Sequence, residues 1–385
     1  MKIAPPAFLA DPGVVRVLDA LPSARVVGGA VRDALAGQAV ADIDLATPML
    51  PAEVAATLAK AGIRSVPTGL DHGTLTAVVD GRGFEITTLR CDVATDGRRA
   101  TVAFTADWRE DAARRDFTIN AMSMTPDGTV FDYFGGIDDL RAGILRFVGD
   151  PATRIAEDYL RILRFFRFTV RYGAGVPDPT ALAAIGGAVG GLATLSVERV
   201  WNELKGLLSE PNPGDAVTSM YDLGVLAAIL PEGALPDGLI RLLGAGAPPD
   251  PVLRLAALVT GDGVAVAMRL KLSAGDRDRL VALSLPLPLG PVDDDAALRR
   301  ALADETPAVL AGRAWLAGQP SLAARLARMP RPVFPLVGRH VVALGVPAGP
   351  RVGALLRDVR AWWMDHDCEP GRPGCLAELT SRIGP

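Results

Sequence analysis

Cysteine, histidine and lysine are scarce in this chain of 385 residues, which contains three, three and four of them, respectively. The odd number of cysteines argues against a disulfide framework, and their spacing matches no metal-ligand pattern. Although Cys368 and Cys375 could pair with each other, we expect all the cysteines to be reduced, as in a cytoplasmic protein. The histidines form no His-Asp metal cluster in residues 206–385, so nothing there indicates an attached phosphohydrolase activity.

Long apolar runs and an excess of positive charge are also lacking. No stretch approaches the length of a membrane span, and the N-terminus has no basic region followed by an apolar core, so we expect no membrane partner. The net charge of −4 excludes a generally basic surface, which means that any RNA site must be a local basic patch. With 49% hydrophobic and 22% charged residues, the chain has the composition of a globular protein.

The pattern of predicted elements divides the chain into two unlike parts. Residues 1–145 alternate short β-rich runs with short helices, which predicts an α/β fold with a mixed sheet and flanking helices. The remainder reads as helices punctuated by proline and glycine, beginning with one strong helix over 152–171. The stretch 91–108 has weak periodicity and reads as a loop, as does the Pro-rich stretch 231–250. The predicted strands are 24–27, 40–46, 74–80, 84–89 and 129–133.

A glycine turn followed by two acids is the most informative motif. Gly28 and Gly29 allow backbone N–H groups to turn toward an anion. If 40–46 is a strand, Asp42 and Asp44 point to the same face and stand side by side. Two carboxylates that close repel each other unless a cation lies between them, and oxygen ligands suit Mg²⁺. A phosphate-cradling turn beside such an acid pair is the minimal apparatus for phosphoryl or nucleotidyl transfer.

A second block joins basic and acidic residues at 114–121. Arg115 offers a bidentate ligand for phosphate, and Asp116 offers an acceptor for a ribose hydroxyl. The same Arg-Arg-Asp sequence is also common at the start of an ordinary, solvated helix. Chemistry alone therefore leaves both readings of this block open.

The predicted helix over 152–171 carries charges at helical spacing. Glu157 and Arg161, at i and i+4, and Asp158 and Arg161, at i and i+3, are expected to meet on one surface. A guanidinium pinned by Glu157 would then present fixed groups to the edge of a base, whereas a solvated, salt-bridged helix face is the alternative reading. A row of arginines at spacings of three, three and four completes the pattern: Arg161, Arg164, Arg167 and Arg171.

Taken together and in this order, these motifs resemble those of the class II tRNA nucleotidyltransferase and bacterial poly(A) polymerase family. The resemblance covers residues 20–172, and beyond them only the general helical character agrees. It implies an α/β nucleotidyltransferase head over 1–145, an all-α neck for nucleobase recognition over 146–210, and an all-α body and tail for tRNA binding over 211–385. The matching blocks are Val27–Asp33, Asp42–Asp44, Phe84–Arg90, Arg114–Ala121, Gly135–Leu140 and Arg154–Arg164.

The resemblance implies a role for each matching residue. Asp42 and Asp44 would be the catalytic carboxylates that hold Mg²⁺. Asp158 and Arg161 would read the Watson–Crick edge of CTP or ATP. The full set of implied nucleotide-binding residues is Gly28, Gly29, Arg32, Arg115, Asp116, Asp158, Arg161, Arg164 and Arg167.

Two further features have less definite roles. The stretch 91–108, with Arg98 and Arg99, would correspond to the flexible element that is linked to the switch from C to A addition. Glu85 either assists the metal site or is a strand residue that faces the sheet.

Within the family, the alternatives are CCA addition to tRNA, addition of CC or A alone, and poly(A) synthesis. The block from His72 into Phe84–Arg90 looks like the CCA-type enzymes. The poly(A) polymerases have a basic Gly-Arg-Arg-Phe-Arg block where this chain has 81–85, which lacks one arginine and ends in an acid. We therefore expect an enzyme that adds CCA to the 3′ end of tRNA from CTP and ATP. An inactive RNA-binding homologue and a small-molecule nucleotidyltransferase are the alternatives from other classes.

Overall fold

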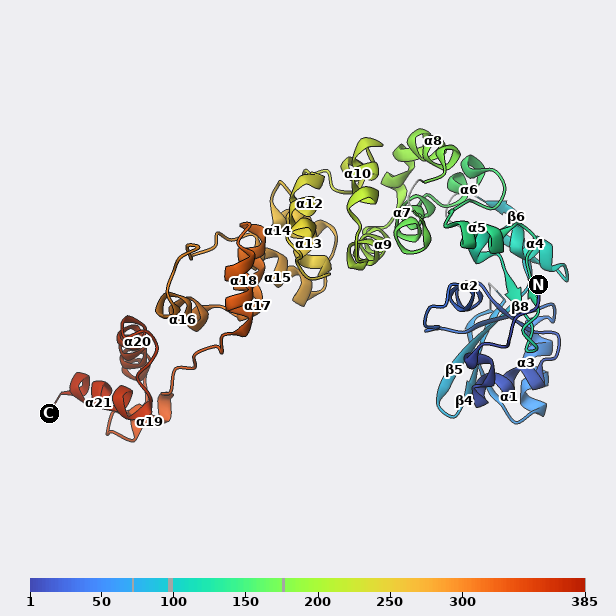
Figure 1. Ribbon diagram of the computed structural model, residues 1–385. Helices are drawn as coiled ribbons and strands as arrows, with labels where there is room; N and C mark the ends of the chain where they lie inside the picture. The colour runs from blue at the N-terminus through green and yellow to red at the C-terminus, as the bar shows by residue number, and fades with distance from the viewer. Residues whose placement is uncertain (71–72, 96–99, 175–176, 385) are drawn as a thin grey trace. The chain divides into compact units, whose positions relative to one another are not determined.

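The computed structural model describes residues 1–70, 73–95, 100–174 and 177–384. The chain forms two compact units, Met1–Ile229 and Leu230–Pro385. In Figure 1 the first unit runs from blue to green and the second from yellow to red. All the predicted catalytic and nucleotide-binding residues lie in the first unit.

A seven-stranded mixed sheet forms the centre of the first unit. Its strand order is β3-β4-β5-β2-β1-β8-β9. Only β2 and β5 pair in parallel among these strands, and the other neighbours are antiparallel. The predicted mixed sheet is thus confirmed. The strands are β1 (Arg25–Val27), β2 (Asp44–Thr47), β3 (Arg64–Gly69), β4 (Thr74–Val79), β5 (Arg82–Thr88), β8 (Ser123–Met124) and β9 (Val130–Phe131).

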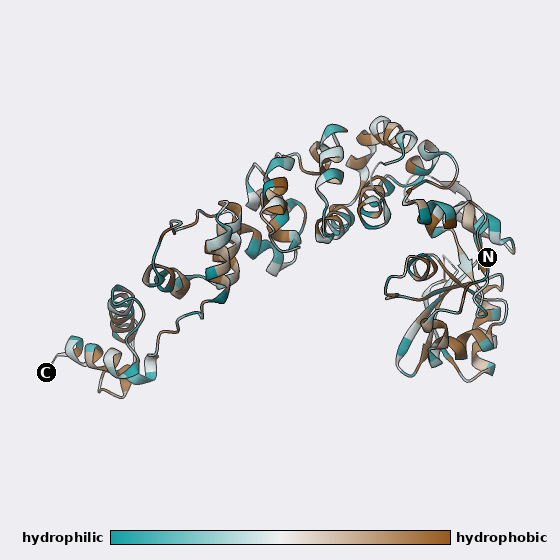
Figure 2. Cartoon of the chain, in the orientation of Figure 1, coloured by the Kyte–Doolittle hydropathy of each residue, from teal (hydrophilic) through white to brown (hydrophobic). Residues whose placement is uncertain are grey.

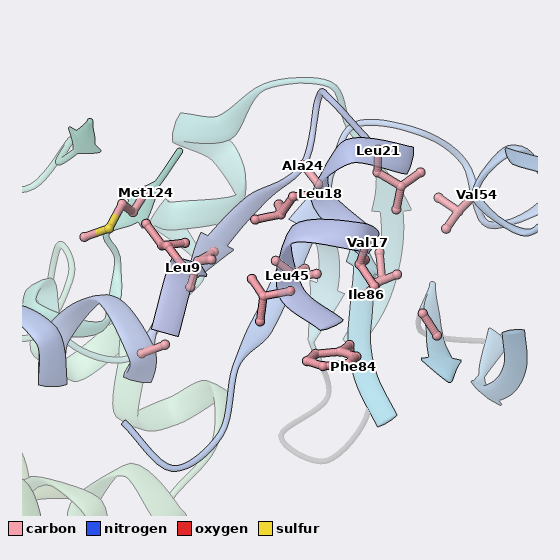
Figure 3. Close-up of a cluster of buried hydrophobic side chains, with 14 of the residues drawn as sticks. Leu9, Val17, Leu18, Leu21, Ala24, Leu45, Val54, Phe84, Ile86 and Met124 are labelled. Atoms are coloured by element: carbon pink, nitrogen blue, oxygen red, sulfur yellow. The ribbon is translucent and has the colours of Figure 1, made fainter. Parts of the chain in front are cut away.

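One face of this sheet is covered by the helices α1 (Pro12–Ala20) and α3 (Pro51–Lys60). Successive strand residues point to opposite faces, so every second strand residue can join the core beneath these helices. Val17 of α1 and Val54 of α3 pack in one buried cluster with strand residues such as Leu45 (Figure 3). Hydrophobic residues, drawn in brown in Figure 2, are prominent in α1. The alternate strand residues Val27 and Ala46 belong to a second, smaller buried cluster with Leu89, against which Trp108 packs.

Strand β2 begins later than the sequence predicted. It starts at Asp44, and the predicted strand residues 40–43 are irregular, so Asp42 precedes the strand. The reason is its neighbour: Val27 pairs with Asp44 and is the last residue of β1, because the chain turns at Gly28. Residues before Asp44 thus have no β1 residue opposite them. The placement of both acids on one strand was wrong.

The stretch read as a loop at 91–108 contains two strands. Strands β6 (Arg90–Thr95) and β7 (Ala100–Phe104) form an antiparallel pair, followed by helix α4 (Trp108–Ala113). Arg98 and Arg99 lie outside the described residues, as does His72. The loop prediction was wrong because a two-stranded ribbon outside the main sheet needs no strongly alternating apolar pattern.

Helices build the rest of the first unit. The predicted helix over 152–171 is two helices, α6 (Pro151–Glu157) and α7 (Leu160–Tyr172), because Asp158 is extended at φ −155° and its carboxylate accepts the N–H of Leu160. A capping aspartate of this kind starts a new helix. The other helices of this unit are α2 (Gly29–Leu35), α5 (Gly136–Ala142), α8 (Pro179–Ala188), α9 (Val197–Ser209), α10 (Gly214–Asp222) and α11 (Val225–Ile229).

The described part of the second unit is helical, as predicted for the C-terminal region. Helix α12 (Pro236–Gly244) replaces part of the loop predicted at 231–250, because its proline occupies the first turn, where proline favours a helix. No helix in the described ranges is long and apolar enough to cross a membrane. The remaining helices are α13 (Pro251–Leu258), α14 (Gly263–Arg269), α15 (Ala274–Leu283), α16 (Asp295–Asp304), α17 (Pro307–Leu316), α18 (Pro320–Arg328), α19 (Gly338–Val342), α20 (Pro350–Asp365) and α21 (Arg372–Ile383).

Candidate active site

The glycine turn lies between β1 and α2. Gly28 has φ 64° and ψ −121°, a conformation that glycine adopts readily and other residues rarely do. Its N–H donates to the carbonyl of Met122 at 3.1 Å, and this hydrogen bond links the turn to the residue just before β8. A Cβ on Gly28 would lie 2.9 Å from Nη1 of Arg115. The glycine therefore permits the Arg115 guanidinium to approach the backbone of the turn.

The acidic centre lies at the beginning of β2. Burial is the main reason that the pKa of Asp44 is raised; the nearby Asp42 carboxylate raises it further, and the Arg115 charge opposes both. The structure thus brings Asp42 within electrostatic range of Asp44, although only Asp44 is in the strand. Two mutually repelling acids that both keep exposed surface at the start of a strand can hold a divalent cation.

A third acid stands beside this pair. Glu85 is the register partner of Asp44 in the parallel β2–β5 pairing. Burial raises the pKa of the Glu85 carboxyl, and the charge of Asp44 raises it further. Among the described residues, no three His, Cys, Asp or Glu side chains form a preassembled metal cage. The donor set fits a Mg²⁺ ion that takes its remaining oxygens from substrate and water.

Arg115 is held by the end of α4. Its Nη2 donates to the buried Asp111 at 3.2 Å, and its Nη1 donates to the carbonyl of Asn120 at 3.4 Å. Asp111 also accepts two hydrogen bonds from Arg114, at 2.8 and 3.0 Å. This anchoring fixes a positive charge beside the glycine turn and within electrostatic range of Asp44.

Asp116 and Arg164 form a partly buried ion pair. Arg164 donates Nε–H to Asp116 at 2.8 Å, and its Nη2 lies 2.7 Å from the same oxygen. Burial would raise the pKa of Asp116, but the Arg164 charge and the hydrogen bonds from Asn120, Arg164 and the Phe117 N–H together lower it. The Asp116 carboxylate is therefore ionised and its orientation is fixed, which restricts how it could approach a ribose.

An aromatic cluster holds this pair in place. The buried Phe117 contacts three rings, with centroids 5.0 Å from Phe147, 6.3 Å from Phe165 and 5.6 Å from Phe168. Two of these rings belong to α7, which also carries Arg164. The cluster thus packs the segment after Asp116 against the helix that supplies its partner, and such aromatic contacts stabilise beyond their buried area.

Arg161 is anchored as the sequence predicted. Its Nη1 donates to Glu157 and to the carbonyl of Arg154, at 2.5 and 2.8 Å, and its Nη2 donates to the carbonyl of Arg114 at 3.1 Å. The i,i+4 pair with Glu157 is confirmed even though the helix breaks between the two residues. A guanidinium with three fixed acceptors has little freedom left, which suits a recognition template.

The predicted contact between Asp158 and Arg161 was wrong. The Asp158 carboxylate pairs with Arg199 of α9 at 2.6 Å and also caps α7. The Arg161 N–H donates to the Asp158 carbonyl at 3.0 Å, but the extended Asp158 backbone directs its side chain to the Leu160 N–H and to Arg199 and not to the Arg161 guanidinium. Asp158 is therefore positioned by a residue from a different helix.

Arg32 is buried and held by hydrogen bonds and aromatic contacts. It donates Nη1–H to Asn120 at 2.5 Å and Nε–H to Asp33 at 2.9 Å, and its guanidinium packs over the rings of Phe168 and Tyr172. It lies close to the glycine turn, since a Cβ on Gly29 would be 3.6 Å from its Nη2. Arg32 thus contributes fixed charge and support next to the turn.

Several residues of the site had no role assigned from the sequence. Asn120 bridges Arg32 and Asp116 through its side-chain oxygen and nitrogen. Glu203 of α9 lies 3.5 Å from Arg164 and 3.2 Å from Arg167. Arg199 and Glu203 are four residues apart on α9, so the sequence shows them as a possible i,i+4 charge pair. Nothing in the sequence indicates that they contact residues of α7 or Asp158 before it. Three members of the arginine row, Arg161, Arg164 and Arg167, pair with carboxylates inside the first unit.

Replacing Asp116 by asparagine is expected to destabilise the first unit by about 3 kcal/mol, because Arg164 would lose its closer carboxylate partner while partly buried and keep only Glu203 at 3.5 Å. The lowered pKa of Asp116 means that its stabilisation is present above about pH 4 and is lost as the pH falls through the folded-state value. Urea unfolding at several pH values measures both effects, and the wild-type protein should lose more stability than Asp116→Asn on acidification. The double variant Asp116→Asn/Arg164→Gln should recover part of the loss; equal stability of wild type and Asp116→Asn would contradict the prediction.

An acidic pair at the start of one central strand of a mixed sheet, beside a glycine turn at the end of the neighbouring strand and followed by helices that carry anchored arginines, is the arrangement of a nucleotidyltransferase. Two family descriptions match the chain: "Poly A polymerase head domain" over residues 24–146 and "Probable RNA and SrmB-binding site of polymerase A" over residues 177–235.

Similar proteins with curated names agree with this class. Two of them are the mitochondrial CCA tRNA nucleotidyltransferases 1 of human and mouse, which are 40% and 39% identical over 358 residues; each match covers 88% of this chain and 82% of the relative. A crystal structure of the Bacillus stearothermophilus CCA-adding enzyme in complex with CTP superposes with a TM-score of 0.71 and 27% identity, covering 97% of this chain and 98% of that one. The chain belongs to the CCA tRNA nucleotidyltransferase family.

Proposed function

We propose that this protein adds the CCA sequence, or part of it, to the 3′ end of tRNA by nucleotidyl transfer from CTP and ATP. The observation that carries the proposal is the position of residues 114–116. The Arg114 carbonyl holds Arg161, the Arg115 charge acts on Asp44, and Asp116 pairs with Arg164. One short segment therefore connects the candidate metal acids to the candidate base-reading helix, as a template-free polymerase requires.

We assign Mg²⁺ to Asp42 and Asp44, with Glu85 as the neighbouring acid. Their hard oxygen donors and mutual repulsion support this assignment. When bound, the metal would lower the pKa of the attacking hydroxyl and neutralise charge that develops on the phosphate.

The proposed reaction forms a bond between the tRNA 3′ oxygen and the α-phosphorus and breaks the bond to the pyrophosphate. The backbone of Gly28 and Gly29 and the Arg115 guanidinium would bind the triphosphate, and the buried Arg32 adds positive charge behind the turn. Arg161, with Asp158, would present hydrogen-bonding groups to the base of CTP or ATP. Arg164 and Arg167 would lie near the phosphates, and the Asp116 carboxylate would face the ribose.

The proposed domains follow these roles: a catalytic head over 1–145, a neck that recognises the nucleobase over 146–210, and a body and tail that bind tRNA over 211–385. We also propose that the protein acts in a cytoplasm. Its three cysteines are free thiols, the state that a reducing compartment maintains. The human and mouse relatives are named as mitochondrial, so the proposed cytoplasmic location applies to this chain and not to those two relatives.

Incorporation of labelled nucleotides tests the proposed function. The substrates are tRNAs that lack one, two or all three nucleotides of the CCA end, each incubated with Mg²⁺ and CTP, ATP or UTP. We expect C at the first two positions, A at the third, and no further growth. Long A tails would instead establish poly(A) synthesis, and extension at only some positions a CC-only or A-only enzyme. Nucleotide binding without incorporation would establish an inactive homologue.

A further inference from the structure

A cavity of about 570 Å³ lies within the second unit, where the helices α12, α13, α15 and α17 meet. Its volume is in the range of roughly 300–1,000 Å³ that is usual for small-molecule sites. The side chains that line it include Arg241, Leu242, Leu280, Leu283, Ser284 and Trp315. Among the described residues, no acidic side chain contributes to the wall. The cavity is thus suited to a ligand that combines an apolar surface with a negative charge.

Two glycines set the close helix contacts that form the walls of this cavity. A Cβ on Gly238 of α12 would collide with the carbonyl oxygen of Ala257 in α13. A Cβ on Gly312 of α17 would collide with the side chain of Leu283 in α15, which is buried and lines the cavity. The cavity is therefore a product of helix packing and is formed before a ligand arrives, which lowers the entropic cost of binding.

Two lining side chains have donor groups for which the described part of the chain provides no acceptor. Arg241, in the last turn of α12, is exposed, and within the described ranges its guanidinium forms no hydrogen bond or ion pair. The partly buried Trp315 packs against the buried cluster that contains Leu298 and Leu302, and it also lines the cavity. Its indole N–H has no acceptor, and its ring pairs with no other aromatic ring, among the residues that the structure describes. Both side chains therefore keep binding capacity for a ligand.

The three polar groups of the wall match the parts of a nucleotide. Every nucleobase has a π-face that stacks on an aromatic ring, and a guanidinium binds phosphate through two hydrogen bonds. The Ser284 hydroxyl donates its hydrogen to the Leu280 carbonyl at 2.9 Å, so its oxygen can accept a hydrogen bond from an amino group of a base. A base that is paired within a duplex is not available for such stacking, which restricts the ligand to an unpaired nucleotide.

We propose that this cavity receives one unpaired nucleotide of the bound tRNA, whose base stacks on Trp315 and whose phosphate binds Arg241. The inference rests on the proposed function, in which residues 211–385 bind tRNA. It assigns to the second unit the recognition of a base, in addition to any contact with the RNA backbone. Such a site favours tRNA over fully paired RNA of the same charge, because a duplex offers no free base to stack.

Filter binding of tRNA that lacks its CCA end, measured in EDTA, tests the site without turnover. Trp315→Leu should weaken tRNA binding about tenfold, because the stacking of one base is lost. Trp315→Phe keeps an aromatic ring and should remain within about threefold of wild type. Arg241→Gln should weaken binding and reduce its salt dependence by about one phosphate contact. Trp362→Leu is the matched control, since this tryptophan of α20 is also partly buried but does not line the cavity.

A fully paired RNA duplex and free mononucleotides distinguish this site from its alternatives. The affinity for the duplex should be the same in Trp315→Leu and wild type, so the preference for tRNA over duplex should fall about tenfold in the variant. Loss of AMP or CMP binding in Trp315→Leu with unchanged tRNA affinity would overturn the proposal and assign the cavity to a free nucleotide. Equal tRNA affinities of Trp315→Leu and wild type would also overturn it. Thermal unfolding confirms that each variant is folded.

Steady-state kinetics separate this inference from the proposed function. Trp315→Leu should raise the KM for tRNA and leave kcat at saturating tRNA unchanged, because the candidate catalytic residues lie in the first unit. Incorporation by wild type with an unchanged KM in Trp315→Leu would contradict the nucleotide site alone. Absence of incorporation by wild type would contradict the proposed function, and the binding experiment in EDTA would still decide whether the cavity holds a nucleotide of tRNA.

Discussion

Replacing Asp44 or Asp42 by alanine is expected to lower the rate of nucleotide incorporation by about a thousandfold or more. Each substitution removes an oxygen ligand from the proposed metal site, and bound metal contributes several kcal/mol to the stabilisation of the transition state. Single-turnover incorporation of labelled CTP into tRNA without its CCA end measures the effect. Asp19→Ala, at an exposed position of α1 in the same domain, is the matched control and should remain active. A rate within tenfold of wild type for either site variant would refute the metal assignment.

Replacing Asp44 should lower activity without lowering the stability of the fold. Because the pKa of Asp44 is raised on folding, its ionised form opposes folding once the pH exceeds the folded-state value. In EDTA near neutral pH, Asp44→Asn should therefore unfold at the same temperature as wild type or higher. Added Mg²⁺ should raise the unfolding temperature of wild type but not of the variant. A loss of stability in EDTA would show that the acid has a structural role.

Replacing Arg161 by alanine is expected to reduce the preference for CTP and ATP over UTP and GTP by about ten- to a hundredfold. A well-oriented bidentate contact to a base edge gives roughly 1–3 kcal/mol of discrimination, and Arg161 is held in one orientation by Glu157 and two carbonyl groups. The ratios of kcat/KM for the four nucleotides measure the effect. The metal acids are untouched, so incorporation itself should persist.

Glu157→Gln distinguishes the effect of orienting the Arg161 guanidinium from the effect of its direct contact with the base. The variant keeps a hydrogen-bond acceptor for Arg161 but loses the charge, so its loss of selectivity should be smaller than that of Arg161→Ala. Arg109→Ala, which removes an exposed arginine of α4, is the control and should leave all four ratios unchanged. Unchanged nucleotide preference in Arg161→Ala would rule out its role as a template.

The sequence predicted the local parts of the site well. The glycine turn and the Glu157–Arg161 pair each depend on residues that are close in sequence, and both are present. The start of β2 was wrong because strand length depends on a partner strand, and β1 ends at Val27. The length of a strand is thus decided by its neighbour and is hard to read from its own pattern.

The long-range pairs could not be predicted in this way. Arg199 pairs with Asp158 and Glu203 with Arg164 and Arg167 only because α9 packs against the beginning and middle of α7. In sequence, Arg199 and Glu203 resemble any charge pair on a helix surface. Their contribution becomes visible only when both helices are placed in space.

The segment 114–116 has a consequence for how such an enzyme changes over time. Its three consecutive residues interact with Arg161 through the Arg114 carbonyl, with Asp44 through the Arg115 charge and with Arg164 through the Asp116 carboxylate, so a shift of the shared backbone moves all three interactions. We expect substitutions that loosen this segment to reduce speed and fidelity together. A variant library at Asn120 and Phe117 would then show error rate and turnover changing in parallel, and accuracy could not be gained there at the expense of rate alone.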